Sequence, residues 1–481
     1  MIRSIGLVLL LSFGSPLVAQ GRLYSDSFES PPIVRQFPLV GGAYQLPAGP
    51  TTNQLVWLLS ELAVGETTTE AEVNTHFDPA WLAQVDAATT VTFINSIRTS
   101  YPNAAVVDVI AVTPVRLTVL IDSPSAPGAP FGFMSLGARY AGTQRIVLFG
   151  VSAFNNVMFP ADQALSLVQA ADKFATLSSA PGLFVGRVRP GGVCEPIIER
   201  QSTTLRATAS IFKTWVLGGV ARAVANNTIT ATTSIPMVAS ELAPGGIINA
   251  EPVGTPFPAG ELAILMMGIS DNTATDLLHQ QVGRPVINQV VSDYAMSQPT
   301  VLTPLLGISE QFHVFRSFDL ATANSYVNGT EPFQQNFLDT QIVPLGPCCS
   351  GPTFHTELLT AGTWRATAAD VCRAFAGLRR TAQGSDAFDL VDRAMGAQVA
   401  QPGVRNLWDR AWYKGGSLAA GNPVQFRVLT HAWLLEDTGR DPYVVVAMSN
   451  SPSTDPGAPG INQFDVQSVL GRILQLTDQL P

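Results

Sequence analysis

Ser210 and Lys213 stand three residues apart at the start of an apolar segment, and together they could carry out nucleophilic catalysis. The segment Trp215–Ala221 is predicted to form a buried helix, so the serine and the lysine lie on one face of it. A buried lysine can lose its proton and then accept one from a serine hydroxyl, which an arginine cannot do. The helix N-terminus also favours the negative charge that develops when the hydroxyl attacks a carbonyl. Taken alone, this spacing more often marks a helix-capping serine followed by a surface lysine.

A second polar group, Ser270-Asp271-Asn272, follows an apolar segment 60 residues after Ser210. In an extended turn alternate side chains point the same way, so Ser270 and Asn272 are expected to face one cleft. A hydroxyl there can pass a proton to a leaving nitrogen, and an amide can hold an amide of the substrate. The alternative is a simple cap on the helix that follows.

The third group is Trp412-Tyr413-Lys414-Gly415-Gly416-Ser417, near the C-terminus. Alternation along a strand places Trp412, Lys414 and Gly416 on one side. Two glycines weaken a strand unless something must approach its backbone closely, and a substrate lying along the strand is such a partner. Lys414 would then supply charge for a substrate carboxylate. The alternative is a hairpin turn at the two glycines.

Lysine is rare in this chain, which makes two of its positions informative. The only lysines are Lys173, Lys213 and Lys414, and the remaining 24 of the 27 basic residues are arginines. Two of the three lysines therefore fall inside the three groups above. A sequence that otherwise uses arginine for positive charge has kept an amine at these two places, which indicates that the amine is needed for chemistry.

Together the three groups resemble the S-x-x-K, S-D-N and K-T-G elements of class A β-lactamases and penicillin-binding proteins, and they occur in the same order. The resemblance covers the chain from about residue 155 to the C-terminus. It implies that Ser210 is the acylated nucleophile and Lys213 its base. It also implies that Ser270 relays the proton to the departing nitrogen and that Lys414 lies where a substrate carboxylate binds.

The same resemblance assigns substrate-binding residues. Asn272 would bind the amide of the acyl side chain, and the backbone N–H groups of Ser210 and Ser417 would form the oxyanion hole. Gly415 and Gly416 would line the strand along which the substrate lies. The change from K-T-G to K-G-G removes a hydroxyl that helps to hold the substrate carboxylate. A lost hydrogen bond to a charged group costs about 1.5 to 3 kcal/mol. Ser417 is the residue that could compensate for it.

A second departure from the family concerns deacylation. No E-x-x-L-N segment follows Ser270, and the interval from Ser270 to Lys414 is 144 residues, longer than in a typical class A enzyme. Glu310 is the nearest acidic candidate, although its surroundings do not match the motif. Hydrolysis of the acyl-enzyme is therefore expected to be slow or to use another base.

The predicted fold class is α+β, in four segments. Residues 1–19 are predicted to be a signal peptide, 20–50 a linker rich in Pro, Gly and Ser, and 51–153 a small domain of helices followed by antiparallel strands. Residues 154–481 are predicted to form the β-lactamase-like domain, an antiparallel sheet flanked by helices with an all-helical lobe. The whole chain resembles most closely the subgroup of the clavulanic acid biosynthetic cluster, which implies a steroid-isomerase-like N-terminal domain.

Composition and the first residues restrict the class of protein, its partners and its location. Apolar residues make up 46% and charged residues 13% of the chain, which excludes a disordered polyelectrolyte. The net charge of -9 without a basic run excludes a nucleic-acid partner. Arg3, the apolar run 5–13 and the small residue Ala19 predict export to the periplasm or the medium after cleavage near Ala19. The alternative is a retained anchor, but the run is too short for a stable membrane span.

The four cysteines are Cys194, Cys348, Cys349 and Cys372. In an oxidising compartment Cys194 and Cys372 are expected to pair with one each of the two adjacent cysteines; the alternative is buried free thiols. No C-x-x-C motif occurs, and none of the five histidines stands at a recognisable ligand spacing from a cysteine, so no metal and no cofactor are expected.

The sequence thus predicts an exported serine hydrolase, expected to be a monomer, that hydrolyses β-lactams or related amides and esters through an acyl-enzyme on Ser210. One alternative is a D,D-peptidase or esterase that acts on peptidoglycan-like substrates and deacylates slowly. Another is a non-catalytic protein that binds β-lactams or peptidoglycan. Retention of both lysines and both serines argues against the non-catalytic alternative.

Overall fold

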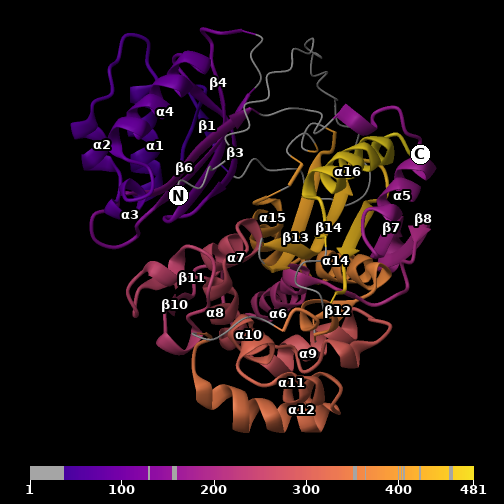
Figure 1. The fold of residues 1–481 in the computed structure, drawn as a ribbon. Coiled ribbons are helices and arrows are strands. Elements are labelled where there is room, and N and C mark those ends of the chain that lie inside the picture. Colours follow the sequence, from indigo (N-terminus) through magenta and orange to yellow (C-terminus); the bar gives the residue numbers. More distant parts are fainter. Residues whose placement is uncertain are drawn as a thin grey trace. The chain divides into compact units, whose positions relative to one another are not determined.

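The computed structural model describes residues 37–481 except 128–130, 154–159, 350–354, 363, 399, 402–403, 405–406, 422–423 and 454–458. The predicted signal peptide and residues 20–36 of the predicted linker lie outside the described residues. The chain divides into two compact units, Met1–Asn155 and Asn156–Pro481, which are described separately (Figure 1).

The first unit contains helices followed by an antiparallel sheet with strand order β3-β4-β5-β6. Its elements are β1 (Leu39–Val40), β2 (Ala43–Tyr44), α1 (Pro50–Glu61), α2 (Glu70–His76), α3 (Pro79–Leu82), α4 (Ala87–Ser100), β3 (Ala105–Val112), β4 (Arg116–Asp122), β5 (Gly132–Ala138) and β6 (Ile146–Ala153). Helix α4 begins where the Asp86 carboxylate accepts a hydrogen bond from the Thr89 N–H. The apolar faces of α1 and α4 pack on the sheet through Leu58, Ile94 and Ile97.

Residues 37–49 differ from the unstructured linker that their composition predicts. Strands β1 and β2 form a hairpin, and Phe37, Tyr44 and Leu46 pack against the core of the first unit. The Tyr44 hydroxyl donates to the Val107 carbonyl of β3. The apolar side chains of this segment outweigh its turn-forming composition, because burying them stabilises the hairpin on the sheet.

The second unit is built on one five-stranded antiparallel sheet assembled from both ends of the unit. The strand order is β13-β14-β15-β7-β8, so the last three strands of the chain pair with the first two of the unit. These strands are β7 (Ala180–Arg189), β8 (Val193–Arg200), β13 (Arg410–Ala420), β14 (Gln425–Glu436) and β15 (Tyr443–Asn450). Strand β13, which carries Lys414, lies at one edge.

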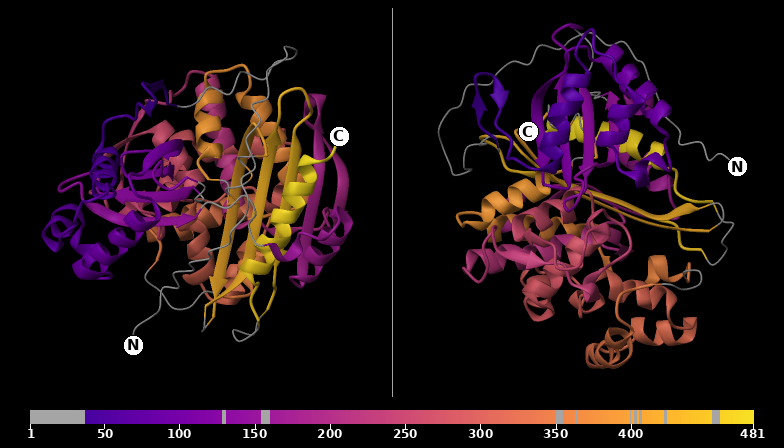
Figure 2. Two further views of the ribbon diagram at one scale, coloured as in Figure 1. Left: turned by 90° about the horizontal axis from the view of Figure 1, so that it is seen from above. Right: turned by 90° about the vertical axis from the view of Figure 1, so that its left-hand side faces the viewer.

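Helices cover both faces of this sheet, and Figure 2 shows the C-terminal helix on one side of the strands and helices from the segment between β8 and β13 on the other. Helices α5 (Leu167–Thr176) and α16 (Gln463–Asp478) pack on the first face around Phe174, Trp433 and Ile473. Helices α14 (Ala368–Ala382) and α15 (Ala387–Gly396) lie on the second face, and α6 (Lys213–Ala225) packs against both of them. The predicted α+β architecture is confirmed.

A helical lobe connects the two halves of the sheet. It contains β9 (Arg206–Ala207), β10 (Ser234–Pro236), β11 (Pro256–Pro258), α7 (Ala259–Gly268), α8 (Asn272–Val282), α9 (Arg284–Asp293), α10 (Ile308–Arg316), α11 (Leu320–Val327), α12 (Glu331–Phe337), α13 (Leu358–Ala361) and β12 (Arg365–Ala366). Helices α10 to α13 enclose a separate apolar cluster that includes Phe315, Tyr326, Leu338 and Leu359. The long interval between Ser270 and Lys414 therefore includes helices with a core of their own.

The disulfide pairing differs from the one that the sequence predicts. Cys194 of β8 is bonded to Cys372 of α14, and Cys348 is bonded to its neighbour Cys349. The predicted pairing of Cys194 and Cys372 with the adjacent cysteines is wrong, because the fold places α14 directly against the β8 edge of the sheet. A bond between residues so far apart in the sequence typically stabilises a fold by about 2 to 4 kcal/mol.

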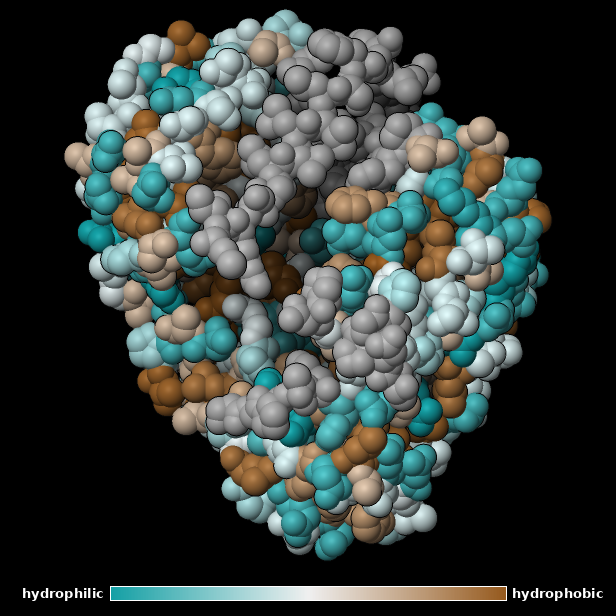
Figure 3. Space-filling model, viewed as in Figure 1, coloured by the Kyte–Doolittle hydropathy of each residue, from teal (hydrophilic) through white to brown (hydrophobic). Residues whose placement is uncertain are grey.

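The described surface mixes polar and apolar residues. On the face drawn in Figure 3, hydrophobic residues are scattered among hydrophilic ones. Within the described ranges, no helix has the length and apolar character needed to cross a bilayer.

Candidate active site

Ser210 lies in a tight turn that leads into α6. The 3₁₀ turn Ala209–Phe212 connects β9 to the helix, and Ala209 adopts a positive φ of 44°. The preceding residue, Thr208, is held on two sides: its N–H donates to the Trp364 carbonyl, and its own carbonyl accepts from the Thr430 hydroxyl at 2.8 Å. These contacts fix the turn between β12 and β14 and leave Ser210 half-buried.

Ser270 occupies the turn between α7 and α8, with a positive φ of 60°. Asp271 is the N-cap of α8, because its carboxylate accepts from the Ala274 N–H at 2.9 Å. The same carboxylate also accepts from the backbone of Ile247 at 2.6 Å. The sequence leaves two alternatives for this group, a helix cap or a part of the active site, and the structure shows both. Asp271 caps the helix, and Ser270 and Asn272 both contact Lys213.

Lys213, the first residue of α6, is fully buried and connects the first two predicted groups. Its ammonium nitrogen donates to the Ser270 carbonyl at 2.7 Å, to the Ser270 hydroxyl at 3.0 Å and to the Asn272 side-chain oxygen at 2.8 Å. The Asn272 amide nitrogen donates to the Pro244 carbonyl at 2.6 Å, which fixes its orientation. All three donor positions of the lysine therefore have partners.

Lys414 of β13 brings in the third group. Its Nζ atom lies 3.1 Å from the Ser270 hydroxyl, so two lysines converge on one serine, and it also donates to the Gly415 carbonyl at 2.6 Å. Lys414 is 2% exposed. Ser417, three residues further along the strand, is exposed.

Gly416 allows β13 to approach Ser210 closely. A Cβ atom at this position would lie 2.6 Å from the Ser210 nitrogen and 2.7 Å from the Thr208 carbonyl oxygen. The backbone nitrogen of Ser210 thus faces the strand that carries Lys414. The chain is extended through both glycines, so the hairpin turn that the sequence left as an alternative does not form here.

Gly415 is explained by a different contact. A Cβ atom there would overlap the hydroxyl of Tyr413, which is hydrogen-bonded to His431 Nδ1 at 2.8 Å. The threonine of a K-T-G element therefore has no room in this chain. The threonine hydroxyl of the K-T-G element is therefore missing here because the Tyr413 side chain fills its space.

Burial governs the charges of the two site lysines. Desolvation lowers the pKa of Lys213 to about 7, although Asp271 and Asp276 oppose this effect. Desolvation also lowers the pKa of Lys414 well below its usual value, and the nearby charge of Lys213 adds to the decrease. An amine with a pKa near 7 is in its neutral, proton-accepting form for about half of the molecules at neutral pH.

Glu310 does not occupy the place of a catalytic acid. Its carboxylate pairs with Arg284 at 2.5 Å and accepts from the Gly307 N–H at 2.8 Å, which caps α10. The Arg284 charge contributes to holding the Glu310 pKa below its usual value against the opposing effect of burial. Both contacts are structural, because they tie the first turn of α10 to α9.

Replacing Glu310 by glutamine is expected to lower the stability of the protein without slowing deacylation. Loss of the charge-assisted hydrogen bond to Arg284 should cost about 1.5 to 3 kcal/mol. The measurement compares chemical denaturation with the decay rate of an acyl-enzyme in the variant and the wild type. A strongly slowed decay with unchanged stability would instead identify Glu310 as the deacylation base.

Several contacts that hold the site together cannot be predicted from the sequence. Asp276 of α8 accepts from the N–H groups of Ile308 at 2.6 Å and Ser309 at 2.9 Å, and so holds the N-terminus of α10. Phe212 stacks on Trp364, with ring centroids 4.0 Å apart and nearly parallel planes. These contacts join residues more than 30 positions apart, and neither the spacing nor the residue types predict them.

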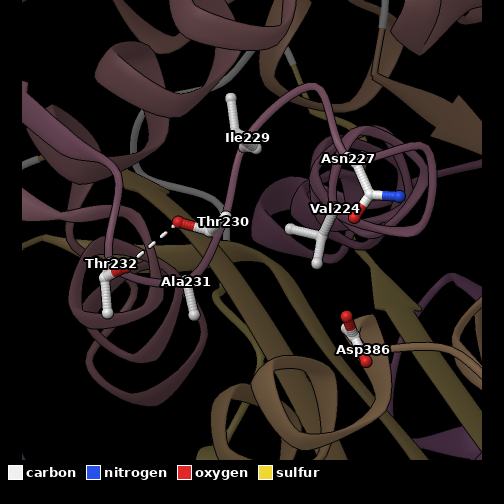
Figure 4. Close-up of a pocket in the computed structure, with 7 residues that line it drawn as sticks. All are labelled: Val224, Asn227, Ile229, Thr230, Ala231, Thr232 and Asp386. Atoms are coloured by element: carbon white, nitrogen blue, oxygen red, sulfur yellow. Dashed lines mark hydrogen bonds between the residues drawn. The ribbon is translucent and has the colours of Figure 1, made fainter.

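A cleft at the other end of α6 is distinct from this site (Figure 4). Its volume is about 230 Å³, and its lining residues are Val224, Asn227, Ile229, Thr230, Ala231, Thr232 and Asp386. Helix α6 has 13 residues, so its two ends are about 20 Å apart. The cleft therefore lies away from Lys213, which is at the first turn.

The five-stranded sheet, the helical lobe and the two buried lysines that contact Ser270 are the features of a β-lactamase-like serine hydrolase. A profile described as the Beta-lactamase enzyme family matches residues 195–464, which is more than half of the chain. The chain belongs to this family.

Comparison with solved structures finds β-lactamases and a penicillin-binding protein. A β-lactamase from Chitinophaga pinensis shares 14% identity with a TM-score of 0.43, over 64% of this chain and 96% of that chain. A β-lactamase from Sphaerobacter thermophilus shares 18% identity with a TM-score of 0.41, over 66% and 99%. A mutant of PBP-A, solved as its acyl-enzyme complex with penicillin G, shares 18% identity with a TM-score of 0.41, over 65% and 98%. No curated protein matches the chain.

Proposed function

We propose that this protein is an exported serine hydrolase of the class A type that is acylated on Ser210 and acts on β-lactams or related amides and esters. The observation that carries the proposal is the convergence of Lys213 and Lys414 on the Ser270 hydroxyl, on segments that adjoin Ser210. Three segments far apart in the sequence meet at this hydroxyl. A proton could therefore pass among these groups within hydrogen-bonding distance.

In the proposed reaction, neutral Lys213 accepts the proton of the Ser210 hydroxyl as the oxygen attacks the substrate carbonyl. The backbone N–H groups of Ser210 and Ser417 stabilise the developing oxyanion. The Ser270 hydroxyl, which contacts both lysines, passes a proton to the leaving nitrogen. This step leaves an ester between Ser210 and the acyl group, and water must later hydrolyse that ester.

The second candidate is a peptidase or esterase of the penicillin-binding type, in which the acyl-enzyme decays slowly. It is favoured by the contacts of Glu310, whose carboxylate pairs with Arg284. Within the described part of the chain, no hydrogen bond of Lys213, Ser270 or Lys414 goes to a carboxylate. A site without an acidic base activates water poorly.

Export and the nature of the first unit belong to the same proposal. The N-terminal residues have the composition of a signal peptide, and the Cys194–Cys372 disulfide fits an oxidising compartment. The order of helices before antiparallel strands in the first unit fits a steroid-isomerase-like domain and hence the clavulanic-acid-cluster subgroup.

The test is intact-mass spectrometry after the protein is mixed with a penicillin, a cephalosporin or a simple ester. We expect a covalent adduct on the wild type and none on Ser210→Ala. Ser385→Ala, which removes a hydroxyl bonded to the backbone of Ala382 and Ala387, is the matched control and should keep the adduct. Rapid turnover of a chromogenic cephalosporin would favour β-lactamase activity. A persistent adduct would favour a peptidase or esterase of the penicillin-binding type. Absence of an adduct with every donor would overturn both.

A further inference from the structure

A group of metal-ligand atoms lies in the helical lobe. One nitrogen of His313 and the sulfur atoms of Cys348 and Cys349 all lie within 4.8 Å of one another. His313 and Cys348 are buried, and the two cysteines are joined by a disulfide. His313 stands 35 residues before Cys348, so a spacing rule applied to the sequence does not reveal the group.

The hydrogen bonds of His313 determine which ring nitrogen faces the sulfurs. His313 Nε2 lies 2.9 Å from the Gly346 carbonyl oxygen. A carbonyl oxygen only accepts, so in the neutral ring Nε2 carries the hydrogen and Nδ1 carries the lone pair. Nδ1 lies 4.0 Å from Cys349 Sγ, and it accepts from the Ser317 hydroxyl at 2.7 Å. Donation of the second ring N–H to a backbone carbonyl is the usual arrangement of a metal-binding histidine.

We propose that Cys348, Cys349 and His313 form a binding site for a thiophilic metal ion such as Zn²⁺ once the disulfide between the two cysteines is reduced. Zinc binds sulfur at about 2.3 Å and imidazole nitrogen at about 2.0 to 2.1 Å, so one ion fits between a nitrogen and a sulfur about 4 Å apart. Two thiolates and one imidazole are ligands that zinc prefers. The fourth position would be taken by water.

The site forms by a balanced reaction. A dithiol reductant gives two electrons and two protons to the Cys348–Cys349 bond and becomes a disulfide itself. Binding of Zn²⁺ then displaces the protons of the two thiols to solvent and joins both thiolates and His313 Nδ1 to the ion. Ser317 turns its hydroxyl away from Nδ1 by rotation about one side-chain bond.

The backbone around the site is anchored before any ion binds. The Cys348 N–H donates to the Ser309 hydroxyl at 2.6 Å, and Ser309 lies in the first turn of α10. His313 lies about one turn further along the same helix. The helix start is itself held by Asp276 through the Ser309 N–H. Ligands supported in this way need little reorganisation, which favours binding.

The test measures zinc binding by competition with a colorimetric indicator, using the full chain before and after reduction with a phosphine. We expect one tightly bound Zn²⁺ per chain in the reduced protein and none at the site in the oxidised protein. His313→Ala should weaken zinc binding at least about tenfold, because even the loss of a residue that only hydrogen-bonds to a metal ligand typically weakens binding by about that factor. Substitution of both cysteines, Cys348→Ser with Cys349→Ser, should abolish it. Ser317→Ala, which removes only the competing hydroxyl, should keep it.

Reduction also opens the Cys194–Cys372 disulfide, so a second double variant, Cys194→Ser with Cys372→Ser, serves as the matched control. It should still bind one zinc ion. Binding of Co²⁺ gives an independent readout, since a thiolate-to-metal charge-transfer band should appear in this variant and not in the variant without Cys348 and Cys349. No zinc in the reduced wild type, or equal binding after loss of Cys348 and Cys349, would overturn the proposal.

Discussion

Replacing Lys213 by arginine is expected to lower the rate constant for acylation of Ser210 by about 100- to 10,000-fold, the contribution typical of a general base. Lys213 is fully buried, and desolvation brings its pKa to about 7, so a large share of the molecules carries the neutral amine at neutral pH. Arginine stays protonated and cannot accept the serine proton. It can still donate hydrogen bonds to Ser270 and Asn272, so the loss reports on the proton transfer.

The pH profile separates this role from a structural one. Below a pKa of about 7 the amine of Lys213 is protonated and cannot act as a base, so the acylation rate of the wild type should fall about tenfold for each pH unit below 7. Above that pKa the rate should level off. The Lys213→Arg variant should lose this dependence. The measurement is stopped-flow acylation by a chromogenic donor between pH 5 and 9.

Lys173→Arg is the matched control for this experiment. Lys173 is the third lysine of the chain, and its ammonium group is partly exposed and paired with Asp162. An arginine can form the same ion pair, so the acylation rate and its pH profile should not change. Acylation of Lys213→Arg at the wild-type rate would show that Lys213 is not the base.

The fold of the second unit could be predicted in outline because its sequence pattern is regular. Continuous apolar runs such as Tyr443–Met448 mark strands of the sheet, and the helical period marks α5 and α16. The sheet built from both ends of the unit follows from the order of these elements. Segment boundaries are less accurate: the apolar spacing predicts a helix over 162–177, whereas α5 begins at Leu167. A capping box at Ser166 and Gln169 determines that start.

The grouping of the site residues could be predicted because a lysine that is buried needs polar partners. Lysines are rarely buried without partners, so two lysines in apolar segments predict a shared polar site. The structure brings Lys213, Ser270, Asn272 and Lys414 into direct contact and places Gly416 beside Ser210. The close approach that two glycines in a strand predict is found at Gly416, against the backbone of the Ser210 turn.

Contacts between distant segments were the part that sequence reasoning missed. The pairing of Cys194 with Cys372 depends on α14 packing beside β8, and the position of His313 beside Cys349 depends on the return of a loop to α10. Glu310 was considered for catalysis from its position alone, whereas its carboxylate binds Arg284 of α9. None of these partners stands at a periodic spacing, so only the folded chain reveals them.

Replacing Gly416 by alanine is expected to slow acylation about 100-fold, the effect typical of a displacement of about 1 Å in an active site. The new Cβ would lie 2.6 Å from the Ser210 nitrogen, 2.7 Å from the Thr208 carbonyl oxygen and 2.8 Å from the Thr430 hydroxyl. Two of these three atoms belong to the backbone, so they cannot move aside as the end of a flexible side chain can. Strand β13 and the turn that carries Ser210 must therefore separate.

The separation should also affect the proposed oxyanion hole, because the Ser210 N–H and the Ser417 N–H lie on the two segments that move apart. Gly396→Ala is the matched control: no atom lies within 4 Å of a Cβ at that position, and the acylation rate should stay at the wild-type value. The measurements are the acylation rate constant and the midpoint of thermal unfolding for both variants. Wild-type acylation by Gly416→Ala would mean that the close contact between β13 and the Ser210 turn is not needed for the reaction.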